Sequence, residues 1–298
     1  MKKSTKVILI LAVAFFTIGI CFVSVGAICG GVKACTKWFK AGDLSFNFGI
    51  FDWYEPGYSI DDDYPVYEGN GMEHIDIADE TINKMVVSVE GALLEVKEGA
   101  DNVIDLRYED ANDLQCYVEG TVLYVVQDIH GVHVGDGTKV YVTLPKDIYF
   151  EEIIVEVGAG KVNISDTVSA RTIIEVGAGK LELNNVDLGI AEIEIGAGAG
   201  TVNGGKAKEL AIEVGMGAFN YEGTVKGNVD AECSMGSISL DIEGKKSDYN
   251  YDVDCAMGKI SVGGTSYSGI GREKYINNGS SYTFVLECSM GNISVKFR

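Results

Sequence analysis

Apolar and polar residues alternate along much of this chain, in short segments interrupted by triplets of small residues. The segments Ile174–Val176 and Leu181–Leu183 flank one such triplet, Gly177–Gly179. Alternation with a period of two is the pattern of a half-buried β-strand. The alternation skips one position across the triplet, so a straight strand could not keep both halves against the same core. Glycine permits a bend there, and the pattern therefore predicts two strands joined at a corner.

The same pattern returns at a fixed interval. The triplets begin at positions 19 residues apart, namely Gly158, Gly177, Gly196, Gly215 and Ser234. Two further copies begin at Ala256 and Ser289, after intervals of 22 and 33 residues. A fixed period is typical of stacked repeats, and 19 residues are too few for a βαβ unit, which needs about 30. We expect an all-β fold, a β-solenoid resembling a single-stranded β-helix with 19-residue rungs.

Aligning the copies predicts three columns of side chains that point into one core. The residue before the triplet is Val157, Val176, Ile195, Val214, Cys233, Cys255 or Cys288. The middle residue is Ala159, Ala178, Ala197, Met216, Met235, Met257 or Met290. The second residue after the triplet is Val162, Leu181, Gly200, Phe219, Ile238, Ile260 or Ile293. Cysteine replaces valine in the first column, so we expect free, buried thiols that serve as small apolar residues.

The N-terminal residues have a different character. Lysines precede an apolar run of about 24 residues from Val7, long enough to span a bilayer, for which about 20 suffice. We interpret residues 1–35 as an uncleaved membrane anchor, with a cleaved signal peptide as the alternative. The short tail before the run favours a single-pass protein of the cell membrane with its domain outside the cytoplasm, although the lysines on the two sides are balanced.

The remaining chain divides into a linker and a repeat domain. Residues 36–82 form an acidic, aromatic juxtamembrane linker, in which residues 41–80 hold eleven acidic residues and no Lys or Arg. Residues 83–298 form the solenoid, with an irregular first unit at 83–150 and repeats at 151–298. Within the first unit, strands are expected at 84–96, 103–108, 114–118, 123–127 and 139–144. Residues 264–282 form the longest insertion, a common place for binding.

Charge narrows the range of partners. The formal net charge is −20, and the first 40 residues contain six lysines and no acid, so all 44 acidic residues lie beyond them. This excludes nucleic acid as the expected partner. One column of the repeat is acidic in all seven copies: Glu156, Glu175, Glu194, Glu213, Glu232, Asp254 and Glu287. Lys161, Lys180 and Lys259, just across the corner, could offset the repulsion. The column is either a solvated stripe or a weak cation-binding array, since calcium needs six to eight oxygens.

Other candidate chemistry finds little support. The glycine triplets recur in every copy and precede strands, whereas a phosphate-binding loop occurs once and precedes a helix. His130 and His133 lack companion ligands at an obvious spacing, and no Gly-x-Ser-x-Gly motif is present. We therefore expect no catalytic residues, no metal, no cofactor and no enzymatic activity.

Several motifs carry a resemblance to a known family. The element Val142–Pro145, rungs of the type Glu156–Ile164, and the closing segment Met290–Phe297 resemble the bacterial putative adhesin domain of unknown function, domain family number 4097. The resemblance covers residues 83–298 and implies a β-solenoid at the cell envelope. The expected function is a membrane-anchored binding or scaffolding module for a surface ligand or envelope protein, either as an adhesin or as part of an envelope-stress system. A polysaccharide-active β-helix enzyme and a cytoplasm-facing regulatory scaffold remain alternatives.

Overall fold

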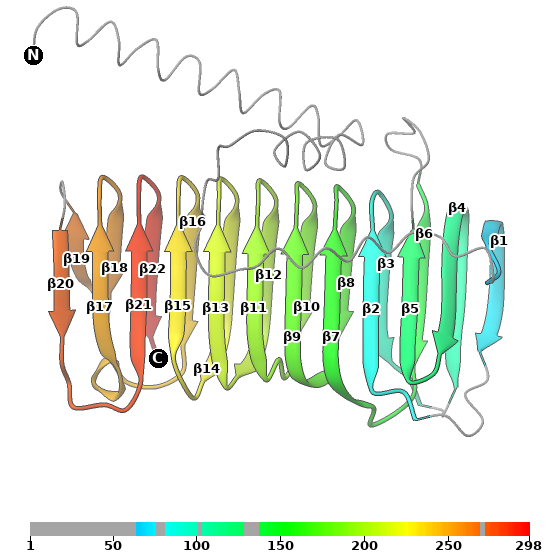
Figure 1. Cartoon of the computed structure of the whole chain (residues 1–298), viewed down its shortest axis with the longest axis horizontal. Coiled ribbons are helices and arrows are strands. Elements are labelled where there is room, and N and C mark those ends of the chain that lie inside the picture. Colours follow the sequence, from blue (N-terminus) through cyan, green and yellow to red (C-terminus); the bar gives the residue numbers. More distant parts are fainter. Residues whose placement is uncertain (1–63, 76–80, 101–102, 128–136, 269–271) are drawn as a thin grey trace, which may run out of the picture. The chain divides into compact units, whose positions relative to one another are not determined.

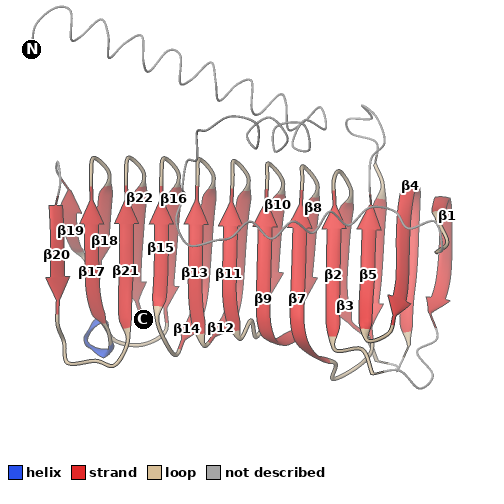
Figure 2. Cartoon of the chain, in the orientation of Figure 1, coloured by secondary structure: helices blue, strands red, loops and turns tan. Residues whose placement is uncertain are grey.

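The computed structural model describes residues 64–75, 81–100, 103–127, 137–268 and 272–298. The predicted membrane anchor, most of the predicted linker, and His130 and His133 lie outside these residues. Within them, helix is limited to one 3-10 turn, η1 (Lys246–Asp248), and no helix has the length and apolarity to cross a membrane. The described chain is otherwise built from β-strands, as the alternation predicts (Figure 2).

Most strands belong to two parallel sheets that lie face to face (Figure 1). In stacking order, the front sheet contains β20 (Arg272–Ile276), β17 (Asn250–Cys255), β21 (Thr283–Cys288), β15 (Val229–Cys233), β13 (Glu209–Val214), β11 (Ile190–Ile195), β9 (Val168–Val176), β7 (Tyr149–Val157), β2 (Lys84–Val89) and β5 (Val122–Gln127). The back sheet contains β19 (Thr265–Ser268), β18 (Lys259–Val262), β22 (Asn292–Phe297), β16 (Ser237–Ile242), β14 (Ala218–Val225), β12 (Ala199–Ala207), β10 (Lys180–Asn184), β8 (Lys161–Ser165), β3 (Leu93–Glu98) and β6 (Lys139–Leu144). In the seven repeats of residues 149–297, each rung has one strand in each sheet and the small-residue triplet joins them, so the predicted corner is confirmed there.

The rungs do not stack in the order of the sequence. The last rung, β21 and β22, lies between the rung of β15 and β16 and the rung of β17 and β18. The rung of β2 and β3 is likewise inserted between β5 and β6 on one side and β7 and β8 on the other. A simple serial solenoid is therefore wrong at both ends. At the C-terminal end the chain first builds β17 and β18 beyond a gap, and β21 and β22 later fill it. At the other end β2 and β3 come first, and the chain adds β5 and β6 on one side before β7 and β8 on the other.

Antiparallel strands close both ends of the stack. At one end, β4 (Ile104–Glu119) pairs with β6 of the back sheet through its first half and with β5 of the front sheet through its second half. The left-handed residues Asp110 and Asp113 lie between the halves, where the strand changes sheets. Outside it, β1 (Tyr67–Ile75) pairs with β4, so the sheet includes residues from the predicted linker. At the other end, β19 and β20 use part of the 264–282 insertion and pair antiparallel with β18 and β17.

The core lies between the sheets and follows two of the three predicted columns. Val176, Cys233 and Cys288 of the first column and Leu181 and Phe219 of the third are buried. Gly200 belongs to the third column because its neighbour needs the space: a Cβ on Gly200 would lie 2.8 Å from the ring of Phe219. The four described cysteines, Cys116, Cys233, Cys255 and Cys288, are buried free thiols, as expected for the last three.

The predicted inward direction of the triplet's middle residue is wrong. Met216, Met257 and Met290 are 39%, 64% and 49% exposed, and Ala178 is also exposed. The alternation of a strand does not continue through a corner, and the middle residue lies at its outer tip. The third residue of the triplet is glycine for a separate reason: the close spacing of adjacent rungs leaves no room for a Cβ there. A Cβ on Gly217 would lie 2.2 Å from the carbonyl oxygen of Gly198 in the adjacent rung.

Candidate functional site: a carboxylate row on the front sheet

The seven acidic residues predicted as a column form one row on the front sheet, which we call the carboxylate row. Each is the next-to-last residue of its strand, and strand alternation turns it away from the core. Their strands pair in register in the order Glu156, Glu175, Glu194, Glu213, Glu232, Glu287 and Asp254. Neighbouring strands are about 4.8 Å apart, so the row places like charges at close, regular intervals.

Burial and mutual repulsion both act on these carboxyl groups. Desolvation, with repulsion from Glu175 and Glu213, raises the pKa of Glu194 to about 7. Desolvation also raises the pKa of Glu232 to about 7, with contributions from Glu287 and Glu213. The pKa of Glu156 is raised to about 7 by desolvation as well, although Ser88 Oγ donates a 3.1 Å hydrogen bond to it. At these three positions the charged form is disfavoured, because each carboxylate loses water and has like-charged neighbours.

Additional carboxylates lie beside the row near its end on β15, β21 and β17. Asp230 and Asp252 each align with Val285 of β21 and flank it. Repulsion from Asp230, Asp254 and Asp252 accompanies desolvation in raising the pKa of Glu287. Sequence reasoning missed Asp230 and Asp252, although each stands two residues before a member of the row. A period of two places such residues on the same face.

Two of the three lysines that could offset the row do not do so. Lys161 and Lys180 lie 3.1 Å and 2.6 Å from the carboxylate of Glu182, on the outer face of the back sheet. Lys180 and Glu182 are two residues apart in β10 and therefore share a face, whereas Glu175 belongs to the other sheet. This expectation was wrong for these two lysines, so the front row keeps its concentrated charge.

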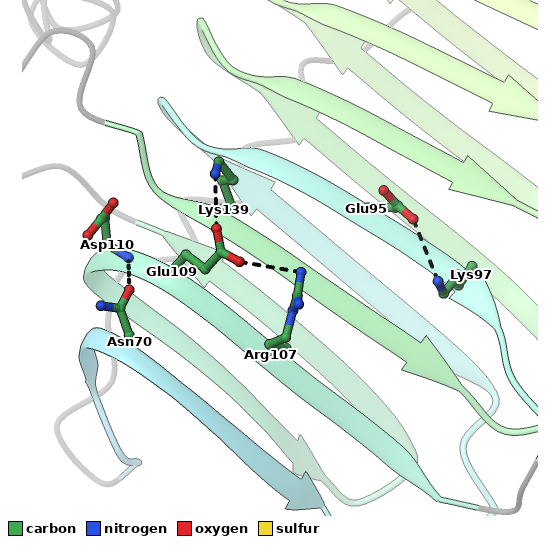
Figure 3. A network of polar contacts seen from close by, with 7 residues as sticks. All are labelled: Asn70, Glu95, Lys97, Arg107, Glu109, Asp110 and Lys139. Carbon is green, nitrogen blue, oxygen red and sulfur yellow. Dashed lines mark hydrogen bonds and ion pairs between the residues drawn. The ribbon is translucent and has the colours of Figure 1, made fainter.

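The back sheet shows the opposite arrangement of charge. Near the end closed by β4, Glu109 contacts Lys139 at 2.9 Å and Arg107 at 3.4 Å (Figure 3). The hydrogen bond from Lys139 lowers the pKa of Glu109. Figure 3 also shows Glu95 and Lys97 in contact on β3, at 3.8 Å. Glu109 and Glu95 thus each have a cation close by, whereas neighbouring carboxylates of the front row repel one another.

The geometry limits what the carboxylate row can bind. In the parts of the chain that the structure describes, no three His, Cys, Asp or Glu side chains converge on a point where they could hold a metal ion. A single row offers one or two carboxylates to any one position, and calcium needs six to eight oxygens. The row suits an extended cationic partner that contacts several rungs more than a single caged ion.

The fold defines the class of protein: an all-β stack of parallel rungs whose two ends are closed by antiparallel strands. Residues 82–266, more than half of the chain, match the Toastrack DUF4097 family. The chain belongs to this family, in agreement with the resemblance found in its rung motifs.

Several solved structures are similar to this chain, and none of them assigns it a function. No curated protein matches the chain. A putative adhesin from Bacteroides fragilis is similar in structure, with 14% identity and a TM-score of 0.40 over 76% of this chain and 97% of that one. A putative lipid binding protein from Parabacteroides distasonis shows 13% identity and a TM-score of 0.32 over 78% of this chain and 98% of that one. The family assignment rests on the sequence match.

Proposed function

We propose that this protein is a binding or scaffolding module of the cell envelope, anchored by its N-terminal segment, that does not perform catalysis. The observation that carries the proposal is the carboxylate row, in which the same charged group is repeated in register across seven strands. A repeated, equally spaced surface suits contact with an extended partner along several rungs. The partner's chemistry follows from the charge: a surface ligand or envelope protein with a run of positive groups.

Orientation is tested first, on intact cells. A protease added outside, at a concentration shown in lysed cells to digest the folded repeat domain, is expected to digest that domain on intact cells as well. Lysine-specific cleavage is informative because lysines occur throughout residues 84–296. Protection until lysis would overturn the envelope-surface proposal and favour the cytoplasm-facing scaffold.

The binding surface is tested with polylysine as a cationic probe and full-length protein in a nonionic detergent. The assay is run at pH 8, above the raised pKa of about 7 of Glu194 and Glu232, so that the variant Glu194→Gln/Glu213→Gln/Glu232→Gln removes three adjacent charges of the row. If each contact contributes about 0.5 kcal/mol, the variant should bind about tenfold more weakly, since about 1.4 kcal/mol is a factor of ten. Wild-type affinity should fall as salt rises, because salt screens exposed charges.

A matched control separates the row from net charge. The variant Glu95→Gln/Glu182→Gln/Glu222→Gln removes three carboxylates from the outer face of the back sheet, on β3, β10 and β14. It should retain most of the affinity. Equal losses in both triple variants would show that total charge alone attracts the probe and would contradict a role for the carboxylate row.

A further inference from the structure

Four methionines form a second continuous row, at the corners between the two sheets. In stacking order they are Met216, Met235, Met290 and Met257, and we call them the methionine row. Backbone hydrogen bonds hold the corners together in that order: the amide of Met235 donates to Gly215, that of Met290 to Ser234, and that of Met257 to Ser289, at 2.7–2.8 Å. These four residues are more than half of the seven methionines in the chain.

Packing does not explain the choice of methionine at these positions. Met216, Met290 and Met257 are 39%, 49% and 64% exposed, and Met235 is half-buried. The same position is alanine in three other rungs, at Ala159, Ala178 and Ala197, and the corner has the same backbone hydrogen bonds there. A long apolar side chain at an exposed corner contributes little to stability through burial. The remaining difference between methionine and alanine is the thioether sulfur, which can bind a metal ion.

The unusual stacking order makes the row continuous. Met290 belongs to the last rung, and insertion of that rung places it between Met235 and Met257. Adjacent rungs are about 4.8 Å apart, and methionine has three rotatable side-chain bonds. Sulfur atoms from three neighbouring corners can therefore turn toward one small ion. Without the insertion, Met290 would lie at the edge of the set.

We propose that the methionine row binds a soft monovalent cation of the copper(I) class through the thioether sulfurs of Met235, Met290 and Met257. Thioethers are soft ligands that favour copper(I), and they carry no proton that must leave before the ion binds. The neighbouring residues Glu232, Glu287 and Asp254, three positions earlier in the same rungs, add negative charge that attracts a cation. This site is independent of the partner proposed for the carboxylate row.

Silver(I) is the practical probe, because it shares the closed-shell character of copper(I) and is stable in air. We expect the full-length protein, in nonionic detergent and chloride-free buffer, to bind silver(I) in a competition titration against a chelator of known affinity. The variant Met235→Leu/Met290→Leu/Met257→Leu should lose at least about tenfold in affinity. Leucine keeps the size and apolarity of these exposed side chains and removes only sulfur, so the fold is preserved and circular dichroism verifies it.

Two further variants assign the ligands. Met72→Leu, at an exposed methionine of β1 outside the row, should bind silver(I) as the wild type does. Cys288→Val removes a buried thiol from the same rung, where valine occupies the equivalent position in other rungs, and should also retain binding. Methyl NMR of labelled methionines should show shifts confined to the row when silver(I) is added.

Three outcomes would overturn the proposal. The first is unchanged silver(I) affinity in the triple leucine variant. The second is loss of binding in Cys288→Val together with unshifted methionine methyl signals, which would assign the ion to thiols. The third is no silver(I) binding by the wild-type protein.

Discussion

The sharpest consequence of the carboxylate row is that removing one of its charges should stabilise the protein. Glu194 lies in the middle of the row, and desolvation and its two neighbours raise its pKa from 4.5 to about 7. Each pKa unit corresponds to about 1.4 kcal/mol, so the shift represents roughly 3 kcal/mol. The side chain is half-buried, and solvent screening reduces the expected effect to about 1–2 kcal/mol.

The sign depends on pH in a defined way. The folded protein holds the Glu194 proton more tightly than the unfolded chain does, so the free energy of unfolding falls as pH rises from about 4.5 to about 7. Above that window the charge of Glu194 destabilises the fold fully, and below it the charge is absent. Glu194→Gln should therefore increase stability at pH 8 by about 1–2 kcal/mol and change it little at pH 4.5.

Urea unfolding followed by far-ultraviolet circular dichroism, at pH 4.5, 6 and 8, measures this difference. The control is Glu192→Gln, on the same strand, whose carboxylate contacts Arg171 at 2.9 Å. Its removal should reduce stability slightly, by about 0.5 kcal/mol. A Glu194→Gln protein that is less stable than the wild type at pH 8, or equally stable at all three values, would refute the argument.

Three other expectations follow from the stacking. Gly217→Ala should lower the free energy of unfolding by about 3 kcal/mol, because its Cβ would lie 2.2 Å from the Gly198 carbonyl oxygen. Gly120→Ala, where a Cβ would have no neighbour within 4 Å, should lower it by only about 1 kcal/mol through its left-handed backbone. Urea unfolding compares the two variants, and equal losses would contradict the steric explanation. Cys233→Val should change stability by less than about 1.5 kcal/mol, since valine fills that column in other rungs. In a Cys21→Ser/Cys29→Ser/Cys35→Ser background, which leaves only the four buried cysteines, thiol labelling should be slow in the folded protein and fast in urea. Rapid labelling of the folded protein would show that these four thiols are accessible. Truncation after Gly279 should expose residues 246–276 to limited proteolysis, because it removes the rung on which β17 and β18 stack. Truncation after Glu243 removes residues 246–276 as well and should leave the remaining rungs protected. Unchanged protection of residues 246–276 in the longer product would argue against the inserted rung.

Local features of the fold were predictable from sequence. The alternation around each triplet defines two strands and a corner within a few residues, and the structure places Val176 and Leu181 inward as expected. The direction of Met257 was not predictable from alternation alone, because the corner interrupts the period. The partner of Lys180 could have been found, since strand alternation places it beside Glu182.

The order of the rungs could not be predicted, for a physical reason. Residues 232–236 and 287–291 have identical sequences, Glu-Cys-Ser-Met-Gly. Identical rungs offer nearly the same hydrogen bonds and the same side-chain ladder to any neighbour, so local pattern does not distinguish serial stacking from insertion. The carboxylate row was visible in the sequence, but its internal order, with Glu287 between Glu232 and Asp254, depends on that insertion.

The inserted last rung also constrains when the protein can be completed during synthesis. Residues 250–262 leave the ribosome before residues 283–297, yet the later segment lies between them and the rest of the stack. A chain that is still emerging, from the ribosome or across a membrane, lacks this rung until residues 283–297 are available. A prematurely ended polypeptide would therefore expose unpaired strand edges next to β15 and β17, where quality-control proteases can distinguish it from the finished molecule.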